Sequence, residues 1–203
     1  MPDKKLKPEI PELADGKTRC TWCLSTSNLV NYHDKEWGVP VHDDRKLFEF
    51  MILDAFQAGL SWSTILNKRE NFRKAFDNFE AGKIAKYSDK KIEKLMNDAG
   101  IIRNKLKINA SVANAKAFLK IQKEFGTFDK FIWQFTDGKT LHNPRKTSKD
   151  IPAKTKESDE MSKALLEKGF KFVGSTICYA FMQAAGMVHD HKTYYFRYKK
   201  IKI

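Results

Sequence analysis

The chain has 203 residues, enough for one sizeable domain or for two small lobes that share a core. Hydrophobic residues make up 41% and aromatic residues 12%, so a buried core can form and wholesale disorder is excluded. The 38 Lys and Arg outnumber the 25 Asp and Glu, and the net charge of +13 points to a polyanionic partner, with nucleic acid ahead of an anionic membrane. The alternative is a merely basic globular protein, which charge alone does not exclude.

No stretch of about 18 apolar residues exists, so we expect no membrane-spanning segment. The first 19 residues are basic but lack the apolar region of a secretory signal. The three cysteines are an odd number and do not make a disulfide framework. We therefore expect a cytoplasmic protein with no membrane partner, and a monomer by default.

Residues 1–19 hold three of the six prolines and almost no apolar periodicity. This composition predicts a disordered or loosely docked tail in front of a single helical domain over residues 20–203. Residues 20–40 are rich in Trp, Cys, His and Asn without clear periodicity. We interpret them as a loop-rich lining rather than as a core element.

Helical patterns dominate the rest of the chain. Apolar spacing predicts helices over residues 44–58, 62–76, 89–98, 104–125, 128–135, 159–168 and 174–187. The residues that can cap five of them are Asp43, Ser61, Ser88, Thr127 and Ser158. Residues 137–157 are polar, contain two prolines and are expected to form a long exposed loop. Because no strand pattern stands out, the predicted class is all-α.

A short turn at Gly100 joins the helix predicted over residues 89–98 to the next one, which makes a helix-hairpin-helix candidate. Backbone N–H groups at a helix N-terminus can hold a DNA phosphate, because the donors and the helix dipole both favour an anion. The stretch 101–123 contains no Asp or Glu, as a phosphate-binding face requires, and carries Arg103, Lys105, Lys107, Lys116, Lys120 and Lys123. Ile102 stands where a second glycine is expected, so an ordinary hairpin with solvated lysines is the alternative.

Asp54 falls on an apolar stripe, because it follows Leu47, Phe50 and Met51 at helical spacing. A buried carboxylate is strongly destabilising unless it is hydrogen-bonded or protonated. A structural pair with Lys or Arg is the first explanation for an isolated buried Asp, and a ligand contact is the second. Gly59 then breaks the helix and places Trp62 at the start of the next one, where its ring can reach a cleft or pack in the core.

Cys20, Cys23, His33, His189 and His191 supply the thiol and imidazole groups that bind tetrahedral zinc. The Cys20-x-x-Cys23 spacing is common, and a pair of free thiols is the alternative. Because the histidines lie at opposite ends of the chain, a zinc site here would join the two termini.

These stretches belong to a series of segments that follow one another from about residue 20 to residue 191. The segments are Cys20-Thr-Trp22, Tyr32-His33-Asp34, Glu36-Trp37-Gly-Val-Pro40, Gln57-Ala-Gly-Leu-Ser-Trp62, Lys68-Arg-Glu-Asn71, Asp98-Ala-Gly-Ile-Ile-Arg-Asn104, Lys168-Gly-Phe-Lys-Phe-Val-Gly-Ser-Thr-Ile-Cys-Tyr179 and Asp190-His191. In all of them the chain resembles the DNA-3-methyladenine glycosylase I family. The resemblance implies an all-α fold of the helix-hairpin-helix glycosylase type, with two lobes around a base pocket and a zinc-bearing N- and C-terminal region.

The same resemblance implies a monofunctional enzyme of base excision repair. Its partner is double-stranded DNA with alkylated bases, and it hydrolyses the N-glycosidic bond of 3-methyladenine without lyase chemistry. The damaged base is flipped out of the stack, since chemistry on a stacked base is not possible. N3-alkylated adenine is cationic and already a good leaving group, so little catalytic apparatus is needed, and the family lacks the catalytic Asp of related glycosylases.

The resemblance also assigns residues. The aromatic base pocket falls on Tyr32 and Trp62, with Trp22 nearby, and the base-reading carboxylate falls on Asp54, so that Asp54, Tyr32 and Trp62 are the candidate catalytic residues. Carboxylate oxygens can accept the adenine amino hydrogens, and aromatic faces attract the cationic ring. The phosphate-binding hairpin falls on Gly100, Ile101, Ile102, Arg103 and Lys105.

Two positions depart from the family pattern. The family has Glu where Asp54 stands, followed by Gly and a small or polar residue, whereas Ala55 and Phe56 follow here. Asp is one methylene shorter, and a displacement of about 1 Å can reduce a rate about 10²-fold. Either the backbone moves closer, or a water bridges the gap, or the preferred base differs.

The second departure concerns structural zinc. Cys20, His33 and His191 match three family ligands, but the fourth, a Cys, falls on Tyr195. A phenol stays protonated up to a pKa near 10 and is a poor zinc ligand at neutral pH. Cys23 or His189 would then stand in as the fourth ligand. Alternatively, zinc is lost and packing of Tyr194, Tyr195 and Phe196 holds the terminus.

Three functions from different classes therefore stand at this point. The first is an active glycosylase for 3-methyladenine or a close relative. The second is a non-catalytic binder of alkylated DNA whose pocket has changed at residues 54–56. The third, a structural zinc module without DNA affinity, is disfavoured by the basic helix.

Overall fold

The computed structural model describes residues 14–199, and the prediction of a loose tail over residues 1–19 falls mainly on residues 1–13, outside the described part. The helices are α1 (Ser27–Lys35), α2 (Asp44–Gln57), α3 (Trp62–Ala75), α4 (Ala81–Ile84), α5 (Asp89–Met96), α6 (Lys105–Phe125), α7 (Phe128–Trp133), α8 (Lys156–Glu167) and α9 (Ser175–Ala184). Short 3-10 turns lie at η1 (Thr21–Cys23), η2 (Asp77–Phe79), η3 (Gln134–Thr136) and η4 (Ser148–Asp150), and the strands are β1 (Leu141–His142) and β2 (Val188–His189). The prediction of an all-α class is confirmed, because helices carry the described chain and the sheet has two short strands.

Local capping explains most of the helix starts. The side chains of Asp43, Ser61, Ser88 and Thr127 each accept a hydrogen bond from a backbone N–H three residues on, as predicted. Asn104 was predicted as the first helical residue of α6, and it is instead its cap. The predicted ends lie within a few residues of the observed ones, since the last turns fray into single turns or 3-10 geometry.

Two predictions about the elements are wrong, and a third holds only in part. Residues 20–40 contain α1, a helix that buries Tyr32 and His33. Helix α8 begins at Lys156, because Thr155 is its cap and Ser158 completes the capping box from the N3 position. The loop over residues 137–157 is largely exposed, as predicted, but it contains the two-residue strand β1, which pairs in parallel with β2.

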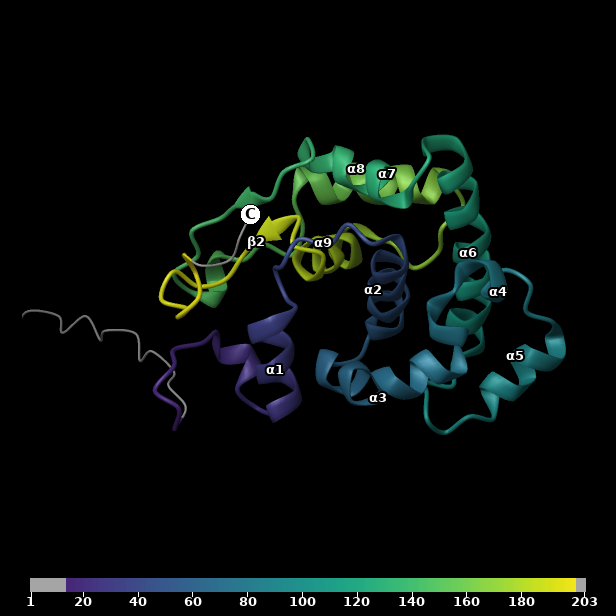
Figure 1. Ribbon diagram of the computed structural model, residues 1–203, viewed down its shortest axis with the longest axis horizontal. Coiled ribbons are helices and arrows are strands. Elements are labelled where there is room, and N and C mark those ends of the chain that lie inside the picture. Colours follow the sequence, from purple (N-terminus) through teal and green to yellow (C-terminus); the bar gives the residue numbers. More distant parts are fainter. Residues whose placement is uncertain (1–13, 200–203) are drawn as a thin grey trace, which may run out of the picture.

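Helix α2 is the centre of the core. Every residue from Leu47 to Phe56 is buried, as expected for a helix that is surrounded on all sides. Figure 1 shows α2 in the middle of the molecule, with α3 on one side and α7 and α8 on the other. Contacts with α3, α6, α7 and α9 complete the enclosure, so a polar side chain on the buried part of α2 needs a partner inside the protein or in a ligand.

The two ends of the described chain meet. The hydroxyl of Thr18 donates to the carbonyl of Tyr194 at 2.6 Å, and the amide of Phe196 donates to the carbonyl of Thr18 at 3.2 Å. In Figure 1, the purple start and the yellow end lie on the same side of the molecule. We call this region the terminal clasp and define it as residues 15–23 and 189–198 together with His33 and Asp34.

The end of α9 approaches the chain between α1 and α2 very closely. Gly186 has a φ of +71°, and a Cβ placed on it would lie 2.3 Å from the carbonyl carbon of Val39, so only glycine fits. The amides of Gly38 and Val41 donate to the carbonyls of Gln183 and Ala185 at 3.0 and 3.1 Å. This contact fixes α9 against the segment that follows α1. No helix within residues 14–199 combines the length and apolar character needed to cross a membrane.

Candidate active site

A cavity of about 220 Å³ opens where η1, α1, α2, the start of α3 and α9 meet. Its lining residues are Trp22, Tyr32, Trp37, Asp54, Gln57, Trp62, Ile151, Ala180, Gln183 and Ala184. The structure therefore brings the four residues assigned to the base pocket, Trp22, Tyr32, Asp54 and Trp62, around a single cavity. Apolar walls with a small number of polar groups are typical of a small-molecule site.

Asp54 is the only carboxyl group in the lining of this cavity. It is 2% exposed, and its Oδ2 atom has no hydrogen-bond partner within the described part of the chain. Burial raises the pKa of Asp54 well above its usual range, and the positive charge of Arg69 opposes this shift only in part. A carboxyl group with a raised pKa can hold a proton, and it can then donate one hydrogen bond as well as accept others.

The contrast with Glu49 on the same helix shows that the structural explanation for Asp54 is wrong. Glu49 is also buried, but its Oε1 lies 2.7 Å from Nε of Arg69 and 2.8 Å from Nη2 of Arg73. The ion pair first expected of Asp54 is thus made by a residue one and a half turns earlier. Asp54 is therefore a buried polar residue that lines the cavity without an ion-pair partner, which is the arrangement expected of a ligand contact.

Aromatic rings form the walls of the cavity. The ring centroids of Tyr32 and Trp62 are 5.2 Å apart, and those of Trp22 and Trp37 are 5.1 Å apart. Gly59, with a φ of +79°, interrupts the helical path after α2, and Ser61 caps α3 so that Trp62 is its first residue. The helix break therefore places the indole at the cavity, as its position in the sequence predicts.

The hairpin between α5 and α6 spans residues 97–104. The amide of Gly100 donates to Oδ1 of Asp98 at 2.7 Å, and Ile101 is buried in the core. Arg103 and Lys105 are exposed at the start of α6. Lys68 of α3 donates to the carbonyl of Ala99 at 2.9 Å, which ties the hairpin to the helix that carries Trp62.

This geometry changes the expected phosphate contacts in two ways. The Gly100 amide is already bound inside the turn, so the groups left to face an anion lie from Ile102 onwards. Lys107 is not part of a phosphate-binding face, because it is buried and donates to the carbonyls of Phe56 and Ala58 at 2.8 and 2.5 Å. Burial lowers the pKa of Lys107, and its ammonium group caps the carboxyl end of α2 beside the cavity.

Comparison with known proteins identifies the family. A family model described as methyladenine glycosylase matches residues 22–198. The chain belongs to the methyladenine glycosylase family. It is 47% identical to DNA-3-methyladenine glycosylase 1 of Escherichia coli (strain K12) over 173 residues, which cover 85% of this chain and 92% of that protein.

Solved structures agree with this family membership. A crystal structure of a 3-methyladenine DNA glycosylase I is 46% identical, covers 88% of this chain and 98% of its own, and superposes with a TM-score of 0.86. A Tyr-to-Phe variant of a 3-methyladenine DNA glycosylase I in complex with 3-methyladenine is 34% identical, covers 86% of this chain and 94% of its own, and superposes with a TM-score of 0.84. The helix-hairpin-helix glycosylase fold expected from the sequence thus holds for this family member.

Several residues that line the cavity of this methyladenine glycosylase were not assigned from the sequence. Trp37 and Gln57 lie in segments that carried the resemblance but received no role. Ala180, Gln183 and Ala184 follow one another at helical spacing and form a face of small residues with one amide on the apolar helix α9. That pattern of small residues could have indicated from the sequence that α9 lines a cavity. Ile151 comes from the loop that was predicted to be exposed, and no sequence pattern indicated its place in the lining.

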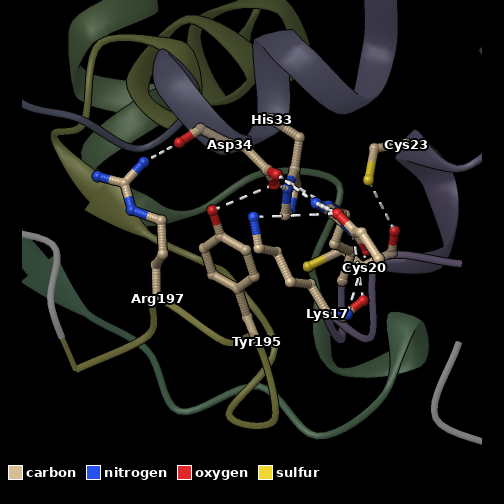
Figure 2. Close-up of polar contacts among 9 residues, drawn as sticks. Lys17, Cys20, Cys23, His33, Asp34, Tyr195 and Arg197 are labelled. Atoms are coloured by element: carbon tan, nitrogen blue, oxygen red, sulfur yellow. Dashed lines mark hydrogen bonds and ion pairs between the residues drawn. The ribbon is translucent and has the colours of Figure 1, made fainter. Parts of the chain in front are cut away.

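The zinc ligands expected of the family lie in the terminal clasp. The ring centroids of His33 and His191 are 4.9 Å apart, and the thiol of Cys20 accepts a hydrogen bond from the amide of Lys192 at 3.4 Å. Tyr195 stacks on His191 with 4.6 Å between the ring centroids and 8° between the planes. Figure 2 shows Tyr195 beside His33 and Cys20, with its hydroxyl directed at Asp34.

Tyr195 departs from the usual donor set of a tetrahedral zinc site. Nε2 of His33 and both ring nitrogens of His191 have no hydrogen-bond partner, but burial raises the pKa of Tyr195, which keeps the fourth position a neutral phenol. Of the two possible substitutes, the Cys23 thiol donates to the carbonyl of Cys20 at 3.1 Å. The His189 ring packs against Tyr198, and neither of its ring nitrogens has a hydrogen-bond partner in the described part of the chain. Within residues 14–199, no three His, Cys, Asp or Glu side chains are grouped so as to hold a metal ion.

Proposed function

We propose that this methyladenine glycosylase is a monofunctional DNA glycosylase that hydrolyses the N-glycosidic bond of 3-methyladenine in alkylated double-stranded DNA. One observation carries the proposal: a buried carboxyl group without a partner faces a cavity with aromatic walls. The relative crystallised in complex with 3-methyladenine supports the same choice of base. The reaction is the first step of base excision repair, and the cytoplasm, where the three unpaired cysteines stay reduced, is the proposed location.

The reaction begins when the damaged nucleotide rotates out of the duplex and its base enters the cavity. The base carries a positive charge, so the faces of Trp62 and Tyr32 attract it more strongly than a neutral adenine. The bond between C1′ of the sugar and N9 of the base then breaks, and its electron pair neutralises the purine. Water adds to C1′ and loses a proton, and the products are free 3-methyladenine and an abasic site.

Asp54 has the two functions needed to read the edge of adenine. That edge presents the acceptor N7 next to the donor N6 amino group. A carboxyl group that holds its proton can donate to N7 with one oxygen and accept from N6 with the other. The raised pKa of Asp54 favours this protonated form.

DNA is held by the hairpin and by the exposed basic residues of α6. Arg103 and Lys105 lie at the N-terminal end of that helix, and Lys116, Lys120 and Lys123 are exposed along it. Their contacts to phosphates would supply the salt-dependent part of the affinity. We propose a monomer as the active form, because one chain contains the cavity and the hairpin together.

The test is release of free bases from methylated duplex DNA, measured by chromatography. The proposal predicts release of 3-methyladenine, with an abasic site left in the strand. If the protein binds methylated DNA more tightly than plain DNA but frees no base, it is the non-catalytic binder and not an enzyme. A protein that does neither contradicts both functions.

We infer in addition that the terminal clasp closes without zinc. Ion pairs and stacking take the place of a metal: Arg19 reaches Asp34 at 2.8 Å, Tyr195 covers His191, and Arg197 donates to the carbonyl of Asp34. The contact between Arg197 and Asp34 joins the two chain ends that a zinc ion would join, and the ring of Tyr195 joins them as well, since its centroid lies 4.5 Å from that of His33. Elemental analysis of protein purified without added zinc tests this inference, and stoichiometric zinc would contradict it.

A further inference from the structure

Beside Asp54, the cavity contains a second polar group whose orientation is fixed from outside. Gln183 of α9 lines the cavity, and its Nε2 donates to Oδ2 of Asp190 at 2.8 Å. An ionised carboxylate accepts hydrogen bonds and donates none, so the side of the amide that faces Asp190 must be the NH2 group. The amide oxygen of Gln183 is then the polar atom that remains for a ligand.

Asp190 is buried and accepts hydrogen bonds from three side chains. It is 1% exposed, and it accepts from Nε of Arg145 at 2.9 Å and from the hydroxyl of Tyr179 at 2.5 Å, in addition to Gln183. The guanidinium of Arg145, which is charged at any physiological pH, forms an ion pair with Asp190. Three donors therefore converge on this carboxylate, Tyr179 and Gln183 from α9 and Arg145 from the loop after β1.

The parallel strands explain why Arg145 is there. The register pairs Leu141 with Val188 and His142 with His189, and the ladder continues as a bridge between Arg145 and Lys192. Arg145 thereby comes beside Asp190, and its Nη1 also donates to the carbonyl of Asp150 at 2.6 Å. The next residue, Ile151, lines the cavity, so a single arginine fixes both the orientation of Gln183 and part of the cavity wall.

We propose that Gln183, locked by Asp190 and Arg145, is a specificity-determining residue that selects purines with an amino group at position 6 over purines with an oxygen there. The locked amide oxygen only accepts, so it pairs with a 6-amino group and repels a 6-oxo group. Asp54 alone does not make this selection, because a carboxyl group that can hold a proton adapts to a donor or to an acceptor. The inference rests on the proposed function, in which a flipped base occupies this cavity.

Binding of free bases tests the inference without requiring catalysis. The probes are 3-methyladenine and 3-methylhypoxanthine, which differ at position 6, and their dissociation constants are measured by calorimetry with the full chain. The wild type is expected to prefer 3-methyladenine by about tenfold or more, because an unmatched buried polar group is strongly disfavoured. The variant Gln183→Met keeps the size of the side chain and removes the acceptor, so the preference should fall by about fivefold.

A second variant tests the lock itself. In Asp190→Asn, Arg145 holds the amide oxygen on its own side, so the new NH2 group faces Gln183 and turns its amide around. The preference for the 6-amino base should then fall by about tenfold or reverse. Gln134→Met is the matched control, because Gln134 is exposed and lies outside the cavity, and it should leave both constants unchanged.

The outcomes separate this inference from the proposed function. If Gln183→Met and Asp190→Asn both keep the wild-type preference, the inference is wrong, whatever the enzyme does to DNA. If the wild type binds neither base, the inference also fails. If the preference changes as expected while methylated DNA releases no base, the selective pocket stands and the proposed catalysis does not.

Discussion

The cavity and the terminal clasp both contain buried polar atoms without partners, but in opposite settings. In the cavity, Asp54, whose Oδ2 has no partner, lines a space of about 220 Å³. In the clasp, Nε2 of His33 and both ring nitrogens of His191 have no partner, and these rings pack against other rings, with Tyr195 stacked on His191 at 4.6 Å. An unpartnered buried atom indicates a ligand site only where room for the ligand remains beside it.

The two regions also differ in how their charges are balanced. Asp34 in the clasp lies between Arg19 and the Nδ1 atom of His33, at 2.8 and 2.9 Å, and Figure 2 shows the dashed contacts that converge on it. Asp54 in the cavity has no such partner. We therefore expect changes in the clasp to affect stability and changes in the cavity to affect base recognition, and each prediction below tests this division.

The largest effect is expected from one Asp variant in each region. Asp54→Leu keeps the size of the side chain and removes the group that both donates and accepts at the adenine edge, so release of 3-methyladenine should slow by about 10²-fold. Thermal stability should stay the same or rise, because the buried carboxyl group was not paired. Asp34→Asn should do the reverse and lower the unfolding free energy by about 1–2 kcal/mol while base release continues.

The measurements are base release under single-turnover conditions and thermal unfolding of both variants. Asp54→Glu adds a further comparison, because it restores the family residue at the same place. If Asp54→Leu releases 3-methyladenine at the wild-type rate, then Asp54 does not recognise the base, and the contrast between the two regions fails.

An aromatic pair tests the same division with a smaller effect. Trp62→Ala removes a stacking face from the cavity and should weaken binding of free 3-methyladenine by about tenfold or more, because stacking on one base contributes about 1–3 kcal/mol. Tyr195→Phe in the clasp keeps its ring on His191 and loses only the long contact from its hydroxyl to Asp34, so binding should not change. Calorimetry with the free base measures both, and equal affinities for Trp62→Ala and wild type would exclude stacking.

The raised pKa of Asp54 predicts a pH dependence of stability. The folded protein binds this proton more tightly than the unfolded chain, so the stabilisation is fully present below the ordinary pKa of 3.8 and is lost as the pH rises through the raised value. Asp54→Asn does not titrate. The wild type should therefore lose stability relative to Asp54→Asn by up to about 1.4 kcal/mol per pH unit within that window, and level off above it. A constant difference across the window would show that Asp54 is ionised throughout.

Much of the fold was predictable because helix starts are local. The caps at Asp43, Ser61 and Thr127 depend on a side chain and an amide three residues away, and the sequence shows both. Helix α1 was missed because its buried face carries Tyr32 and His33, which serve the cavity and the clasp and disturb the apolar pattern. Functional residues thus obscured the element that positions them.

The candidate site divides in the same way. Asp54 was conspicuous from periodicity alone, because a carboxylate on an apolar stripe conflicts with its neighbours. The role of Gln183 was not visible in the sequence, because it depends on Asp190 and Arg145. Arg145 is brought beside Asp190 by the parallel pairing of two strands that are each two residues long. No local pattern encodes that register, since strands this short show no alternation.

The smallest effect is expected from removing metal. If stacking and ion pairs close the clasp, a chelator should leave the melting temperature of the wild type unchanged, and zinc content should stay below about 0.2 equivalents. Tyr195→Cys replaces the neutral phenol with a thiol beside two imidazoles that have unpartnered nitrogens, so this variant should bind zinc and become sensitive to the chelator. If a chelator destabilises the wild type, the unpartnered histidine nitrogens bind a metal ion. The presence of free space beside an unpartnered atom would then no longer distinguish the ligand site of the cavity from the clasp.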